Sequence, residues 1–263
     1  MNGAEMRLGR LFDRQSGNAF VAAFDHGLTL RVSPENPVGV VERIVSTCEP
    51  EGVLLSPGML KRTTHLFAHR GAPVPLVRCD FALLDDDLKA SGESYRVICS
   101  PEEAASLGAG CAVMFLILGV EEGDLFAENA AAVAEAATAS HRVGVPLMVE
   151  ATLWGSRIDD KRDPELLAFA CRIAAELGAD VIKTEYTGSV ETMRRVVEGC
   201  PVPILTLGGP KTDSGDALIE ATRGAILAGA RGVVYGRNIW QADDPRKVSS
   251  AVREAVHGVY AGR

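Results

Sequence analysis

The fold is decided by a stretch that reads Ala-Asp-Val-Ile-Lys-Thr-Glu-Tyr-Thr-Gly, residues 179–188. A short apolar run leads into one cation, Lys183, and a loop follows at once, which is typical of a buried strand in a parallel sheet. An ammonium group at the end of such a strand loses favourable hydration, and this cost favours the neutral amine. A neutral amine is what imine formation with a ketone or aldehyde requires. The alternative is a lysine whose stem lies on the strand while its ammonium reaches solvent.

Seven further short apolar runs, each followed by an amphipathic stretch, repeat this pattern along the chain. They cover residues 19–24, 52–55, 74–80, 111–118, 146–151, 202–206 and 232–235. Eight strand–helix units in 263 residues predict an α/β fold, a single (β/α)8 TIM barrel. A doubly wound open sheet is the alternative, but it usually has fewer strands, and the first turn here carries no GxGxxG sequence.

We expect one domain over residues 1–263, in which residues 1–18 form a helix and loop that precede the barrel. Ser100 and Asp163 are predicted N-caps, since each stands directly before a proline that opens a helical pattern. The third strand is expected to be followed by an irregular insertion that contains Asp85, Asp86, Asp87 and Tyr95.

Composition excludes several classes of protein. The net charge is −8 and no basic tract is present, so nucleic acid is not expected as a partner. No run of 18 apolar residues and no signal-peptide pattern occur, so we expect no membrane partner and a cytoplasmic location. Six scattered cysteines without a CxxC pair favour free thiols over a disulfide or zinc site.

Polar residues follow most of the predicted strands, at the end of a barrel where active sites lie. They are Asp25, His26, Ser56, Arg78, Asp80, Glu150, Thr152, Lys183, Thr206 and Arg237. The period of two places Lys183 on the same face as Val181, and Glu150 on the same face as Met148 and Thr152. If both faces point inward, Lys183 and Glu150 come from adjacent strands and meet near the barrel mouth.

Each of these residues also has a purely structural interpretation. Asp25 could cap the following turn, and His26 could be a buried, hydrogen-bonded imidazole. Glu150 could form a structural ion pair with Lys183, which is compatible with a role in proton transfer. Arg78 could pair with Asp80.

Two glycine-containing loops follow the seventh and eighth predicted strands, the usual phosphate site of a TIM barrel. Gly208, Gly209 and Lys211 lie in the first loop, and Gly236 and Arg237 lie in the second. Glycine N–H groups can surround phosphate oxygens, and an arginine adds a fork of charged donors. The alternative is two helix-initiating turns with Arg237 in a salt bridge at the rim.

Several stretches together resemble the class I, Schiff-base aldolases of the archaeal fructose-bisphosphate aldolase type. The sequence is also similar to the 2-amino-3,7-dideoxy-heptulosonate synthases and the autoinducer-2 phosphate thiolase of that group. The matching stretches are Phe24–Gly27, Leu55–Gly58, Asp180–Gly188, Cys200–Pro203, Gly208–Lys211 and Gly236–Gln241.

The resemblance implies that Lys183 forms the imine, that Asp25 assists proton transfer, and that the two glycine loops bind a substrate phosphate. It implies no metal and no cofactor, since the protonated imine is itself the electron sink. It also implies a phosphorylated small-molecule substrate and a homo-oligomer. His26, Thr152, Trp154 and Arg78 are expected to contact the substrate.

One stretch departs from the family pattern. Aldolases of this group carry Tyr-Pro-Arg-Gly after the fifth strand, and here Thr152 and Trp154 occupy the tyrosine and arginine positions. Because threonine is a poor proton-transfer group at neutral pH, we expect Glu150 or Tyr186 to act on the departing hydroxyl instead. A thiolase-like acyl transferase and a barrel that binds sugar phosphate without turnover are the alternative functions.

Overall fold

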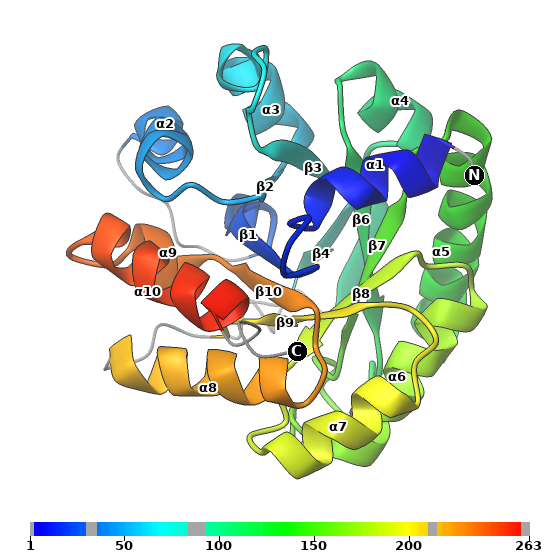
Figure 1. Cartoon of the computed structure of the whole chain (residues 1–263). Coiled ribbons are helices and arrows are strands. Elements are labelled where there is room, and N and C mark those ends of the chain that lie inside the picture. Colours follow the sequence, from blue (N-terminus) through cyan, green and yellow to red (C-terminus); the bar gives the residue numbers. More distant parts are fainter. Residues whose placement is uncertain (1–2, 30–35, 84–92, 122, 210–214, 259–263) are drawn as a thin grey trace.

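A computed structural model describes residues 3–29, 36–83, 93–121, 123–209 and 215–258. Its centre is a closed parallel barrel in the order β1-β2-β3-β6-β7-β8-β9-β10, with β10 paired to β1 (Figure 1). The strands are β1 Ala19–Phe24, β2 Gly52–Leu55, β3 Val74–Arg78, β6 Cys111–Ile117, β7 Leu147–Thr152, β8 Val181–Glu185, β9 Ile204–Leu207 and β10 Gly232–Tyr235. This topology confirms the predicted (β/α)8 TIM barrel.

The other helices surround the barrel, whereas α1 precedes β1 in the chain and lies across one end of the barrel (Figure 1). The helices are α1 Gly3–Leu11, α2 Pro37–Thr47, α3 Pro57–Thr63, α4 Pro101–Ser106, α5 Gly123–Val143, α6 Pro164–Glu176, α7 Val190–Glu198, α8 Gly215–Leu227, α9 Arg237–Trp240 and α10 Pro245–His257, with 3-10 turns η1 His26–Leu28 and η2 Thr64–Leu66. Ser100 and Asp163 cap α4 and α6 as predicted, each with proline at the helix start. An N-cap of this kind stabilises a helix by about 1 kcal/mol.

The barrel interior is apolar toward the amino ends of the strands. Alternate residues of the strands point inward, among them Val21, Leu54, Met148 and Val181, and they pack together with Leu11 of α1. Leu11 is fully buried, so α1 closes this end of the barrel (Figure 1). With that end filled by side chains, polar groups can enter the interior only toward the carboxyl ends of the strands.

The region after β3 is more regular than predicted. Asp80–Leu83 (β4) and Ser94–Val97 (β5) form an antiparallel hairpin, in which Ala82 pairs with Tyr95. Tyr95 is therefore a buried strand residue and not part of an irregular insertion. Asp85, Asp86 and Asp87 lie outside the described residues.

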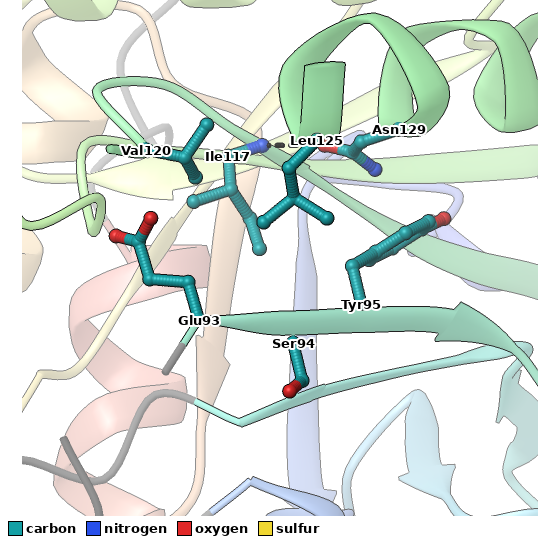
Figure 2. A pocket seen from close by; sticks show the side chains of 7 residues that line it. All are labelled: Glu93, Ser94, Tyr95, Ile117, Val120, Leu125 and Asn129. Atoms are coloured by element: carbon teal, nitrogen blue, oxygen red, sulfur yellow. Dashed lines mark hydrogen bonds between the residues drawn. The ribbon is translucent and has the colours of Figure 1, made fainter. Parts of the chain in front are cut away.

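A narrow cavity lies where this hairpin meets β6 and α5 (Figure 2). Its lining residues are Glu93, Ser94, Tyr95, Ile117, Val120, Leu125 and Asn129. Asn129 Oδ1 accepts a 2.9 Å hydrogen bond from the Ile117 N–H across it. None of the candidate catalytic residues lines this cavity, so it belongs to the packing of the hairpin against the barrel. Within the described part of the chain, no helix combines the length and apolar character that crossing a membrane requires.

Candidate active site

Lys183 and Glu150 meet inside the barrel, as the period of two predicts. They are paired neighbours in the register between β7 and β8, and both side chains point inward above Met148 and Val181. Lys183 Nζ lies 2.8 Å from Glu150 Oε1, and both residues are buried. The lysine is therefore an interior group and does not extend along the strand to solvent.

Arg78 of β3 joins three carboxylates beneath the barrel mouth. Its Nε lies 3.0 Å from Asp25 Oδ2, its Nη1 lies 3.5 Å from Asp80 Oδ1, and its Nη2 contacts Glu150 Oε2. The guanidinium carbon also lies 3.7 Å from the centre of the Phe115 ring. Arg78 is fully buried and surrounded by these groups, so in this structure it holds the carboxylates in place, and its contact with substrate stays a prediction.

The carboxylates around Arg78 differ in their affinity for protons. Burial alone would raise the pKa of Asp25, but the positive charges of Arg78 and Lys183 outweigh it and lower that pKa to about 2. Burial raises the pKa of Asp80 to about 7, although Arg78 and the Phe115 N–H act in the opposite direction. Asp25 is therefore a fixed negative charge at neutral pH, whereas Asp80 is partly protonated.

Glu185 is a further buried carboxylate, which the sequence interpretation did not include among the site residues. It ends β8, two residues beyond Lys183, and is only 6% exposed. Trp154 Nε1 donates a 2.5 Å hydrogen bond to Glu185 Oε1. Burial raises the pKa of Glu185 to about 8, and the nearby charge of Glu150 contributes in the same direction. The signal that could have found it is its even spacing from Lys183.

Thr152 and Trp154 lie beside these carboxylates. Thr152 is buried on the same interior face as Glu150, and its hydroxyl has no hydrogen-bond partner among the described residues. The centres of the Trp154 and Phe115 rings lie 5.7 Å apart, and the Trp154 N–H donates its hydrogen bond to Glu185. Trp154 is thus held by protein contacts on both its ring and its nitrogen.

Tyr186 does not join the site. It lies one residue beyond Glu185, and its hydroxyl is packed against Gly224 of α8, where a Cβ would collide with the tyrosine oxygen. The ring belongs to the apolar layer between the barrel and the helices. The Tyr186 hydroxyl therefore lies at α8, away from the interior face that carries Lys183, and its role in proton transfer stays a prediction that this arrangement does not favour.

The two glycine loops after β9 and β10 approach each other and His26. Arg237 Nη2 donates to the Gly209 carbonyl at 3.3 Å, and Asn238 Nδ2 donates to the Gly208 carbonyl at 2.9 Å. A Cβ on Gly236 would collide with the His26 ring. Lys211, the remaining predicted phosphate ligand, lies outside the described residues.

His26 lies between the carboxylates and these loops. Its ring stacks edge-on against Trp240, with 6.0 Å between ring centres, and its Nδ1 lies 4.0 Å from Asp25 Oδ1. Burial lowers the pKa of His26, which keeps the imidazole neutral at physiological pH. In the described ranges, no group of three or more His, Cys, Asp or Glu side chains is arranged to hold a metal ion.

A closed barrel with a buried lysine beside carboxylates, at the carboxyl ends of its strands, defines the class of TIM-barrel enzymes that work through an imine. Residues 14–242 match the model of the DeoC/LacD family aldolases, and the chain belongs to this family. The expected relationship to Schiff-base aldolases is confirmed.

Two relatives and one solved structure place the chain within the family. An uncharacterized aldolase of Saccharolobus solfataricus is 34% identical over 98% of this chain and 95% of its own length. A 2-amino-4,5-dihydroxy-6-oxo-7-(phosphonooxy)heptanoate synthase of Streptomyces griseus is 30% identical over 96% of this chain and 89% of its own. The structure is an archaeal fructose-1,6-bisphosphate aldolase, its catalytic lysine bound to the carbinolamine intermediate; it matches with a TM-score of 0.83 and 27% identity, over 96% of this chain and 99% of that one.

Proposed function

We propose that the chain is a Schiff-base aldolase that makes or breaks a carbon–carbon bond in a phosphorylated, ketose-like substrate, with Lys183 as the nucleophile. The observation that carries this proposal is the buried Lys183 amine, 2.8 Å from Glu150 Oε1 at the carboxyl end of a barrel strand. Imine formation needs a neutral amine and a nearby group that takes its proton. The Glu150 carboxylate is placed to be that group.

The reaction follows from the charges around Lys183. The amine adds to the substrate carbonyl, and loss of water from the resulting carbinolamine gives a protonated imine. That imine draws electrons from the neighbouring carbon–carbon bond and becomes an enamine when the bond breaks. Asp25, ionised and within electrostatic reach of Lys183, supports the positive imine with a fixed negative charge. Arg78 keeps Asp25 and Glu150 in place.

The substrate class follows from the relatives and the glycine loops. The Streptomyces griseus synthase and the archaeal aldolase are each named after a compound in which a ketone lies next to a phosphorylated carbon. Gly209 offers unobstructed backbone, Gly208 and Gly236 leave no room for a Cβ beside Tyr235 and His26, and Arg237 Nε has no partner among the described residues. We assign these groups, together with Lys211, to the phosphate, and His26, Thr152 and Trp154 to the rest of the substrate.

Borohydride should trap a covalent adduct when the protein is incubated with dihydroxyacetone phosphate, the smallest ketone that carries a phosphate on the adjacent carbon. Reduction of the imine fixes the substrate on the lysine, and peptide mass analysis locates it at Lys183. Lys183→Ala should give no adduct, whereas Lys161→Ala, which changes an exposed lysine, should trap like the parent protein. Equal trapping in Lys183→Ala would exclude Lys183 as the nucleophile.

Arg237→Gln should raise KM for the phosphorylated ketone by about 10- to 100-fold, the effect of losing one charge-assisted hydrogen bond. Unphosphorylated dihydroxyacetone is the matched control, because it has no phosphate to lose. Steady-state kinetics with both ketones makes the comparison. The phosphate assignment fails if KM rises equally for both.

The replacement of the family tyrosine by Thr152 supports acyl transfer as the second candidate function. Consumption of coenzyme A during turnover would favour it over aldol chemistry. Phosphate binding without turnover on any ketose phosphate would favour a non-catalytic barrel.

The family resemblance and the exposed Leu166 and Phe169 of α6 support the proposal of a homo-oligomer, which light scattering can measure.

A further inference from the structure

The carbon–carbon bond step needs a group that exchanges a proton with the substrate hydroxyl, and most interior candidates are engaged elsewhere. Glu150 uses one oxygen on Lys183 and the other on Arg78. The Tyr186 hydroxyl faces Gly224 of α8. Thr152 is inward-facing, but a hydroxyl of this kind is a poor acid at neutral pH.

Glu185 has the position and the free oxygen that this step requires. It lies two residues beyond Lys183 on the same strand and face, a separation of about 7 Å along the strand. Its Oε1 accepts the Trp154 indole N–H, which fixes the carboxyl group, while Oε2 has no hydrogen-bond partner within the described part of the chain. This buried, unpartnered oxygen lies on the same interior face as the Lys183 amine to which the substrate would be joined.

We propose that Glu185 is the catalytic acid–base of the carbon–carbon bond step, an inference that rests on the proposed Schiff-base function. In cleavage, the Glu185 carboxylate takes the proton of the hydroxyl on the carbon that departs. The oxygen electrons form the new aldehyde C=O, and the electrons of the breaking carbon–carbon bond move into the protonated imine to give the enamine. In the reverse reaction, aldol addition, the same steps run backwards, and the protonated carboxyl of Glu185 returns its proton to the aldehyde oxygen.

The electrostatic surroundings of Glu185 suit this exchange. Burial and the charge of Glu150 raise the pKa of Glu185 to about 8, while Trp154 and Lys183 act in the opposite direction. A group that titrates close to neutral pH is efficient both as an acid and as a base. Trp154 acts here as a positioning residue, because it holds Glu185 and does not itself exchange the proton.

Glu185→Gln separates this step from imine formation. Glutamine has the shape of the neutral carboxyl and can still accept the Trp154 N–H, so the fold should persist. Borohydride trapping with dihydroxyacetone phosphate should stay within about twofold of the parent protein, because imine formation does not use Glu185. Addition of dihydroxyacetone phosphate to glyceraldehyde 3-phosphate, or to the best substrate of an aldehyde panel, should fall about 10²- to 10⁴-fold.

Two companion variants sharpen the result. Tyr186→Phe should keep the addition rate within about twofold, because its ring lies outside the barrel interior. Trp154→Phe removes a hydrogen bond that favours ionised Glu185 and therefore raises the Glu185 pKa. The rise of kcat/KM for cleavage near pH 8 should shift to higher pH in that variant and disappear in Glu185→Gln.

If Glu185→Gln lost both borohydride trapping and aldol addition, the inference would be overturned, because Glu185 would then be needed for imine formation or for the fold. An addition rate above about a tenth of the parent value would also overturn it, as would loss of addition in Tyr186→Phe alone. Failure of the parent protein to trap at all would instead refute the proposed Schiff-base function, and the inference with it.

Discussion

Lys183→Arg should lower aldol turnover by about 10⁴-fold or more while the barrel remains folded. Arginine keeps a positive charge beside Glu150, but its guanidinium stays protonated and cannot supply the neutral amine of an imine. At about 1.4 kcal/mol for each factor of ten, the lost transition-state stabilisation amounts to about 5–6 kcal/mol. Single-turnover kinetics with a phosphorylated ketose measures the loss, and thermal unfolding monitors the fold.

Lys183→Met is the informative partner of this variant. It removes the charge as well as the amine, while Glu150 keeps its contact with Arg78. Equal losses in both variants are expected if the amine acts as a nucleophile. If the arginine variant kept most of the activity and the methionine variant did not, Lys183 would act through its charge and the imine mechanism would be wrong.

The sequence alone was sufficient for the pairing of Lys183 with Glu150. Two adjacent strands and a period of two are local rules, and they placed both side chains on inward faces that meet at 2.8 Å. The same rule, applied two residues beyond Lys183, places Glu185 on the inward face, whereas Tyr186 follows the end of β8 and its hydroxyl packs against Gly224. Glu185 was left out because candidates were chosen by family likeness, where tyrosines follow the lysine, and not by the direction of each side chain.

The arrangement around Arg78 could not be predicted in the same way. Arg78 contacts Asp25 of the segment after β1 and Glu150 of β7, and neither β1 nor β7 is paired with β3. Such contacts cross the barrel interior, so they depend on strand tilt and on the side chains that fill the space below. The hairpin of β4 and β5 was missed for a different reason, since strands of four residues carry little periodicity.

The prediction with the largest effect on stability concerns Arg78. Arg78→Met should lower the free energy of unfolding at neutral pH by about 3–5 kcal/mol, because it leaves buried carboxylates without their shared cation. Asp80 lessens the loss, since its pKa is already raised to about 7 and it can take up a proton. Most of the deficit therefore comes from Asp25 and Glu150. Urea unfolding measures it, and Arg172→Met, which breaks an exposed pair with Glu176, should change stability by only about 0.5 kcal/mol.

The pH dependence of this deficit identifies its source. Asp25 has a folded-state pKa of about 2, below its ordinary value of 3.8, so its contribution to stability is fully present above pH 3.8 and is lost as the pH falls toward 2. Without Arg78 that depression is reduced, and the variant should differ most from the parent protein above pH 4 and approach it at lower pH. A deficit that stays constant down to acid pH would mean that Arg78 stabilises the barrel through its packing against Phe115 and not through its charge.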